Sequence, residues 1–179
     1  MLHHNLRLPY TPALEPYELN ERALLIDTET VGSGQTTEII EVAVADYRGE
    51  IVFESLVRPL VNRLPPPSKH HRFARSEFES APYWADVWPE FSKLIENRLL
   101  VAYNAAFDRR ALAVTCALYR VTPQERAWRC AMPLVKARLG LKRNPTLSQA
   151  CAHFGVEGGN HRARQDTQAL CALLPAVCR

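Results

Sequence analysis

The 179-residue sequence is most informative at first for what it lacks. It has no apolar run near the ~18 residues that a membrane-spanning helix needs. It has only seven glycines, and no GxGxxG or GxxxxGKS/T motif, so a dinucleotide site or a P-loop is not indicated. Its five cysteines form no CxxC pair and are odd in number, which argues against a disulfide framework or a zinc site. What remains is an ordinary globular composition, large enough for one hydrophobic core.

The beginning of the chain differs from the rest. Residues 1–20 contain three prolines and little hydrophobic periodicity, which predicts an N-terminal arm that packs on one domain formed by residues 21–179. The first residues lack the basic-then-apolar layout of a secretory signal, so we expect a cytoplasmic location. The net charge of +3 is compatible with a polyanionic partner but does not indicate one.

Apolar patterning predicts an α/β domain with a mixed central sheet. Three strands come first, with a hairpin between the second and the third, and strands then alternate with helices. This order implies a mixed sheet flanked by helices. Strands are expected over residues 22–27, 38–46, 50–58, 99–103 and 128–131. Helices are expected over residues 85–97, after 104, over 133–139 and 147–154, and from about 162 onward.

Two acidic residues follow the apolar run of the first strand. Asp27 and Glu29 point to the same side, because side chains in a strand alternate with a period of two. Neighbouring carboxylates repel unless a positive charge lies between them, and carboxylate oxygens are the ligands that Mg²⁺ and Mn²⁺ prefer. The alternative is a pair of solvated acids at the end of a strand.

A second acidic position follows the fourth strand. Asp108 falls in the first turn of a helix that begins after Asn104, a good N-cap residue. Its negative charge interacts favourably with the helix macrodipole there, or the turn places its carboxylate at the same end of the sheet as Asp27. Phe107 begins the apolar stripe of this helix.

A third group lies near the C-terminus. Asp166 lies four residues before Leu170 and so continues the buried face of the last helix, where a carboxylate is costly without a cation or donors. His161 would lie about 140° away from Asp166 on one continuous helix, so it must belong to the preceding loop to serve the same site. Gly158 and Gly159 give that loop freedom. The alternative is a surface histidine.

Together, the three motifs resemble the DnaQ-like 3′-to-5′ exonucleases of the DEDDh type, and the Asp-Thr-Glu-Thr form is similar to the proofreading epsilon-like branch. The resemblance implies a ribonuclease H-like fold and two-metal hydrolysis of a phosphodiester, with two divalent ions, Mg²⁺ or Mn²⁺, as cofactors. It implies four metal ligands, namely Asp27, Glu29, Asp108 and Asp166. It implies that His161 is the general base.

The resemblance also places five residues near the terminal nucleotide of the substrate: Thr30, Val31, Gly32, Asn104 and Phe107. For Phe107, a role in the core of its helix remains an equal alternative. Tyr103 stands where the family usually has histidine. The basic segment at 70–75 is a further candidate for contact with a single strand, through phosphates and stacking on Phe73.

We therefore expect an exonuclease that releases nucleoside 5′-monophosphates from 3′ ends, with single-stranded DNA as the favoured substrate. Because the chain ends soon after Asp166, we expect a stand-alone enzyme rather than a subunit tethered to a polymerase. An RNA-trimming enzyme resembling oligoribonuclease or ribonuclease T is the alternative, and a non-catalytic nucleic-acid-binding subunit is a third possibility. The protein is expected to act without a membrane, as a monomer or a homodimer.

Overall fold

The computed structural model describes residues 10–62, 64 and 73–178, so the expected basic segment lies outside it as far as Arg72. The predicted order of strands and helices is confirmed. The strands are β1 Ala23–Val31, β2 Glu38–Asp46, β3 Ile51–Leu56, β4 Leu99–Ala102 and β5 Ala127–Cys130. The helices are α1 Trp84–Ile95, α2 Ala105–Leu118, α3 Met132–Arg138, α4 Leu147–Phe154 and α5 Ala163–Val177. Short 3-10 helices are η1 Pro16–Glu18, η2 Gly34–Thr36 and η3 Arg75–Phe78.

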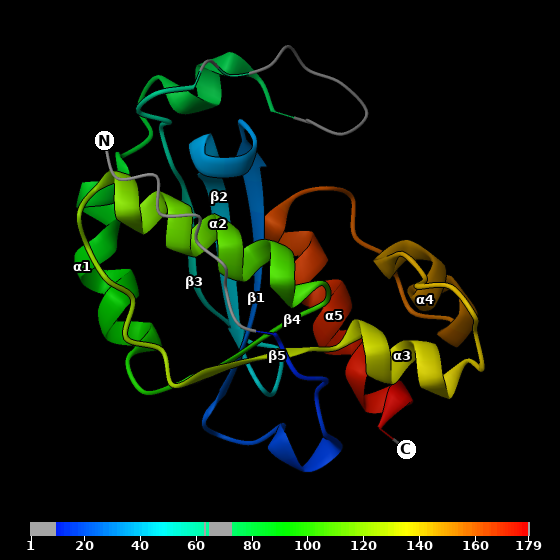
Figure 1. The fold of residues 1–179 in the computed structure, drawn as a ribbon. Coiled ribbons are helices and arrows are strands. Elements are labelled where there is room, and N and C mark those ends of the chain that lie inside the picture. Colours follow the sequence, from blue (N-terminus) through cyan, green and yellow to red (C-terminus); the bar gives the residue numbers. More distant parts are fainter. Residues whose placement is uncertain (1–9, 63, 65–72, 179) are drawn as a thin grey trace.

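The sheet is mixed, with strand order β3-β2-β1-β4-β5 (Figure 1). β1 pairs antiparallel with β2 and parallel with β4, and β4 pairs parallel with β5. The hairpin between β2 and β3 closes where the Asp46 N–H donates to the carbonyl of Glu50, at 2.9 Å. The topology thus combines an antiparallel hairpin with parallel neighbours, which is the mixed sheet that the sequence predicted.

Helices cover both faces of the sheet, and the side chains of β1 alternate between them. Leu24 and Ile26 belong to the core that α1 and α2 complete. Ala23 and Leu25 belong to the core completed by α3, α4 and α5. Since the side-chain period is two, odd-numbered residues of β1 face α5.

The first strand is longer than predicted. β1 continues through Asp27 and Glu29 to Val31, because its pairing with β2 extends that far, with a register shift between Glu29 and Thr30. Its pairing with β4 covers only Ala23–Leu25. Beyond Leu25, the edge of β1 on the β4 side is therefore available for hydrogen bonds to residues outside the sheet.

The described part of the arm lies along the outer edge of β5. The Leu14 N–H donates to the Cys130 carbonyl and the Cys130 N–H donates to the Pro12 carbonyl, both at 2.9 Å. Glu18 forms an ion pair with Arg129 at 2.8 Å. Leu14 is buried against the α5 side of the sheet.

Helix α2 buries Ala111 and Val114 of the predicted apolar stripe, but not Phe107, at which the stripe begins. Phe107 is 48% exposed, whereas Asp108 is 4% exposed. The buried side includes Ala111, Leu112 and Thr115, so the helix is turned to bring an acidic residue inward. The physical reason is the bonding of Asp108 to β1, described below. Throughout the described residues, no helix has both the length and the apolar character required to cross a bilayer.

Candidate active site

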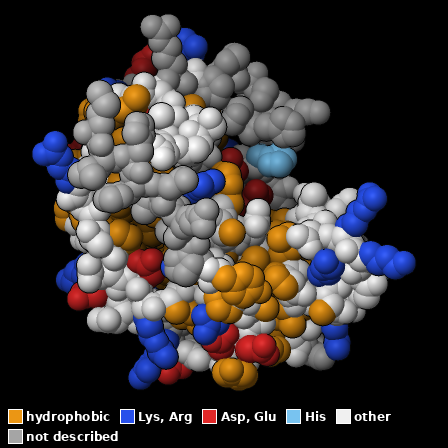
Figure 2. Space-filling view, viewed as in Figure 1, with side chains coloured by type: hydrophobic (Ala, Val, Ile, Leu, Met, Phe, Trp, Pro, Cys, Tyr) orange, Lys and Arg blue, Asp and Glu red, His pale blue; other side chains and the backbone are white. Residues whose placement is uncertain are grey.

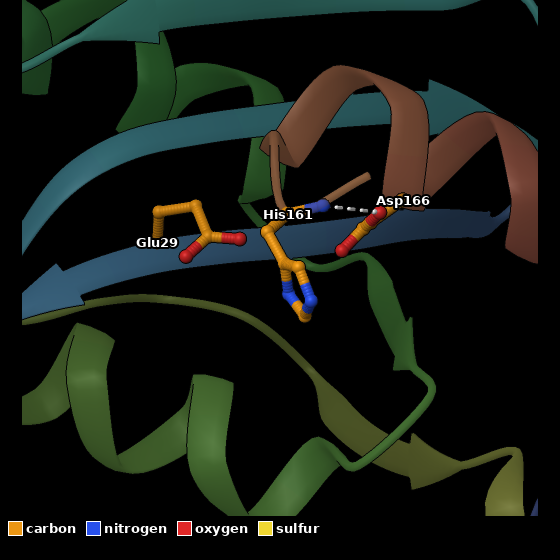
Figure 3. A group of neighbouring side chains, drawn as sticks. All are labelled: Glu29, His161 and Asp166. Atoms are coloured by element: carbon orange, nitrogen blue, oxygen red, sulfur yellow. Dashed lines mark hydrogen bonds between the residues drawn. The ribbon is translucent and has the colours of Figure 1, made fainter. Parts of the chain in front are cut away.

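Three side chains, from β1, from the loop before α5 and from the first turn of α5, meet at one end of the sheet (Figure 3). Ligand atoms of Glu29, His161 and Asp166 all lie within 4.8 Å of one another. Helix α5 begins at Ala163, so His161 lies in the loop before it, with a positive φ of 64°. The His161 N–H donates to Asp166 Oδ1 at 3.3 Å, which couples the loop to the helix.

Asp108 reaches β1 from the other side of the sheet. The backbone N–H of Thr28, on the flank that β4 no longer pairs, donates to Asp108 Oδ1 at 3.0 Å, and the Thr28 hydroxyl donates to the same oxygen at 2.9 Å. Asn104 is at the N-cap position of α2 but makes no side-chain capping bond, contrary to expectation. The first turn of α2 is instead held to β1 through Asp108.

Asp27 lies at the centre of the negative charge. Burial, and then the carboxylates of Asp108, Asp166 and Glu29, raise the pKa of Asp27 well above its ordinary value. The four acidic residues from three separate segments therefore act on one another electrostatically.

The other three carboxyl groups shift in the same direction. Burial and then the Asp166 charge raise the pKa of Glu29 to about 8. Burial raises the pKa of Asp108 to about 7, against the opposing hydrogen bonds from Thr28. Burial also raises the pKa of Asp166, partly offset by the backbone of His161. Near neutral pH, these groups ionise together only if positive charge is supplied.

A divalent cation fits this donor set. The donors are carboxylate oxygens, the ligands that Mg²⁺ and Mn²⁺ prefer, and their raised pKa values reflect buried negative charge that the surrounding side chains do not neutralise. Asp27, Glu29, Asp108 and Asp166 are the residues that would hold such ions. His161 is close enough to Glu29 and Asp166 to be a fifth donor by distance alone.

Glu41 and Arg162 lie at the site but were not predicted from the sequence. Glu41 is the cross-strand partner of Glu29 in the β1–β2 register, so two glutamates lie directly opposite each other. Arg162 Nε donates to Glu41 Oε1 at 3.0 Å, and the N–H of Ala163 donates to Oε2 at 2.7 Å. Arg162 also partly lowers the pKa of Glu29. Only the adjacency of Arg162 to His161 signals this role in the sequence.

Gly159 has a different role from the one expected. Neither Gly158 nor Gly159 has a positive φ. A β-carbon on Gly159 would instead overlap the carboxylate of Asp166, with Asp166 Cγ 2.6 Å away. Glycine is therefore required for the close approach of this loop to Asp166.

The residues expected near a terminal nucleotide are not all equally available. Asn104 and Phe107 are exposed, and Thr30 is half-buried. Val31 is 8% exposed and packs in a small core with Ile40, Phe73 and Phe78. Gly32 has a φ of +81°, and a β-carbon there would lie 2.8 Å from the side chain of Asn62. Phe73, proposed to stack on bases, is buried in that same small core.

Comparison with known families identifies the class of protein. Residues 24–174 match the RNase_T family, described as exonucleases, and the chain belongs to this family. It is 30% identical over 176 residues to the uncharacterized exonuclease CP81 of Escherichia phage 186, covering 90% of each chain. It is 33% identical over 159 residues to Exodeoxyribonuclease 10 of Escherichia coli K12, covering 84% of this chain and 66% of that protein.

Solved structures agree with this assignment. A structure of Exonuclease X in complex with 5′ overhanging duplex DNA superposes with a TM-score of 0.64 at 28% identity, covering 87% of this chain and 90% of the other. The nuclease domain of 3′hExo, a DEDDh family member bound to rAMP, superposes with a TM-score of 0.57 at 17% identity, covering 86% and 89%. The predicted ribonuclease H-like fold and the DnaQ-like resemblance are confirmed, and the protein is an exonuclease that acts on nucleic acids.

Proposed function

We propose that this chain is a metal-dependent 3′-to-5′ exonuclease that releases nucleoside 5′-monophosphates and favours single-stranded DNA. The observation that carries the proposal is the convergence of Asp27, Glu29, Asp108 and Asp166, with His161 beside them, at one end of the sheet. Such a cluster suits two divalent ions, Mg²⁺ or Mn²⁺. When bound, these ions would stabilise negative charge on the attacking and leaving oxygens of an in-line displacement.

His161 is proposed to be the general base. A histidine imidazole can accept a proton from the attacking water near neutral pH, which suits this role. As the new O–P bond forms, the bond between phosphorus and the 3′ oxygen of the penultimate nucleotide breaks, and that oxygen takes a proton. The loop position of His161 allows its ring to approach the phosphate after the 3′ end has entered.

Asp27, Glu29, Asp108 and Asp166 are proposed to hold the ions, and Thr28 to orient Asp108. The two hydrogen bonds from Thr28 fix one Asp108 oxygen and leave the other for a ligand. Exposed Asn104 and Phe107 are proposed to contact the terminal nucleotide, together with Thr30 and the backbone near Val31 and Gly32.

DNA is the preferred polymer because the names of several relatives above 25% identity concern DNA. One is named an exodeoxyribonuclease, another is named a DNA polymerase, and a third was solved with duplex DNA. The cytoplasmic location, the independence from membranes and the choice between monomer and homodimer stay predictions from the sequence.

The test uses DNA and RNA oligomers of matched sequence, labelled at either end. With Mg²⁺ or Mn²⁺, the 5′-labelled DNA should shorten stepwise, and the 3′ label should appear at once in a nucleoside 5′-monophosphate. EDTA should stop both. Stepwise shortening of 3′-labelled DNA would contradict the polarity, and equal or faster loss of RNA would contradict the substrate preference.

A further inference from the structure

The segment between the fifth strand and the histidine loop contains no acid. No Asp or Glu occurs between Glu125 and Glu157, while lysine and arginine occur at six positions: Arg126, Arg129, Lys136, Arg138, Lys142 and Arg143. The last four belong to α3 and to the loop that joins it to α4. The whole chain has 22 basic and 19 acidic residues, so a strong excess of positive charge is a property of this segment and not of the chain.

The last four of these residues lie on one side of the molecule, with α3 and the loop that leads to α4. In Figure 2, the side where α3 and α4 lie in Figure 1 carries Lys and Arg side chains with no Asp or Glu of the described residues visible among them, and a histidine beside recessed acidic side chains lies on the same face. Lys142 and Arg143 are exposed, and Lys136 is partly exposed. We call the surface carrying Lys136, Lys142 and Arg143 the basic surface.

The basic surface is fixed to the catalytic end of the sheet by two contacts. The buried hydroxyl of Tyr103, at the end of β4, donates to two carbonyl oxygens of the basic loop between α3 and α4. These are the carbonyl oxygens of Pro145, at 3.0 Å, and of Thr146, at 3.2 Å. Tyr103 directly precedes the turn that carries Asp108. The basic loop is therefore attached to the strand end from which the site is built.

The second contact joins α4 to the histidine loop. A β-carbon on Gly158 would lie 3.8 Å from Ser148 Cα and 3.9 Å from Cys151 Cβ, so this loop runs against α4 in ordinary van der Waals contact. Both α3 and α4 also pack against α5, whose first turn carries Asp166. A ligand that leaves the site on this side meets positive charge on an ordered surface.

We propose that the basic surface binds the phosphate backbone of the nucleic acid at a distance from the 3′ end that enters the site. This inference rests on the proposed function, because only a polymer extends beyond the site. Lysine and arginine side chains that neutralise phosphates bind without reading the sequence, and they make binding depend on salt. The surface therefore increases affinity for long substrates and leaves cleavage at the terminal phosphate to the acidic cluster.

The test measures binding without turnover. Fluorescence anisotropy in EDTA reports the affinity for a single-stranded DNA of about 20 nucleotides, longer than most single-domain sites. The double variant Lys142→Ala/Arg143→Ala should bind about tenfold more weakly at ~0.15 M salt. The slope of log K against log salt should be shallower by about 1.4, from ~0.7 per lost phosphate contact.

Two controls separate local from general effects. Lys142→Arg/Arg143→Lys preserves both charges and should bind as the wild type does. Lys93→Ala removes an exposed charge from α1, on the side of the molecule opposite α3 and α4, and should leave the slope unchanged (Figure 1). An equal loss of affinity in either control would overturn the proposal.

Cleavage assays complete the test. With Mg²⁺ or Mn²⁺, the double variant should show a higher KM on the long oligomer and unchanged kcat/KM on a dinucleotide. Equal losses of kcat/KM on both substrates would overturn the proposal. An unchanged salt slope would also overturn it and would favour an acidic protein as the partner of this surface. Failure of the wild type to release nucleotides would contradict the proposed function instead, while the binding data in EDTA would still decide the role of the surface.

Discussion

Arg162 neutralises Glu41 at the point where α5 meets the sheet. The Nε and Nη2 atoms of Arg162 both lie 3.0 Å from Glu41 Oε1, and Arg162 also pairs with Glu77 at 3.2 Å. Its guanidinium carbon lies 4.6 Å from the ring centroid of Phe73. Arg162, the residue next to His161, thus joins β2 to η3.

Arg162→Ala is expected to destabilise the protein by about 2 kcal/mol, because it leaves the largely buried Glu41 carboxylate with fewer donors. Activity should fall by roughly tenfold or more, since a displacement of the start of α5 moves catalytic groups. Thermal unfolding and single-turnover rates measure the two effects. Arg164→Ala is the matched control, because Arg164 and its partner Glu54 are 43% and 49% exposed, and such pairs contribute little. Equal losses in the two variants would contradict a special role for Arg162.

Thr28→Val should weaken the hold on Asp108. Valine has nearly the shape of threonine but lacks the hydroxyl that donates to Asp108 Oδ1 at 2.9 Å, while the backbone donor remains. We expect Mn²⁺ affinity and turnover to fall by about 10- to 100-fold, as for other groups that orient a metal ligand. Calorimetric Mn²⁺ titration checks this. Thr28→Ser keeps the hydroxyl and should retain most of both properties, and a serine variant as impaired as the valine variant would contradict the explanation.

His161→Asn should reduce kcat by about 10²- to 10⁴-fold, the typical contribution of a general base. Asparagine is chosen because it tolerates the positive φ of 64° at this position. Mn²⁺ affinity should change little, because the carboxylates are proposed as the ligands. A sharp fall in Mn²⁺ affinity would instead place the imidazole among the ligands, as its distance from Glu29 and Asp166 permits.

Without divalent ions, stability should fall as the pH rises. The folded-state pKa values of Glu29 and Asp108 are raised from 4.5 to about 8 and from 3.8 to about 7. The folded protein therefore holds protons that the unfolded chain releases above about pH 4, and this contribution is lost as the pH rises through 7 to 8.

Differential scanning calorimetry in EDTA at about pH 6 and about pH 8.5 tests this dependence. Mg²⁺ or Mn²⁺ should raise Tm more at the higher pH, because the ions bind the ionised carboxylates. The control is Glu29→Gln, which should reduce both the pH dependence and the gain on adding metal. A metal-free Tm that rises between these pH values would contradict the assigned shifts.

The sequence predicted the fold well where the pattern was local. The apolar run before Asp27 and the alternation of strands and helices are properties of neighbouring residues, and they led to the observed element order. It predicted less well where distant partners decide the outcome. The stripe of α2 left a core role for Phe107 as an equal alternative, but Phe107 is exposed, whereas Asp108 is buried and bonded to Thr28.

The same reason explains what was missed in the site. Glu41 looks like an ordinary strand residue until its register with Glu29 and its bonds to Arg162 and Ala163 are known. In the sequence, Gly159 resembles a flexible loop residue, whereas in the structure it is needed because a β-carbon would overlap the Asp166 carboxylate. Neither the contacts of Glu41 nor that of Gly159 can be inferred from neighbouring residues in the sequence.

Four carboxylates are proposed to hold divalent ions, with His161 beside them as the base. This arrangement can be seen by anomalous diffraction from crystals grown with Mn²⁺ and a nucleoside 5′-monophosphate. Two manganese peaks are expected, with oxygens of Asp27, Glu29, Asp108 and Asp166 about 2.0–2.6 Å from them. An empty acidic cluster, or a single ion bound by Glu29, His161 and Asp166 that does not contact Asp27, would contradict this arrangement.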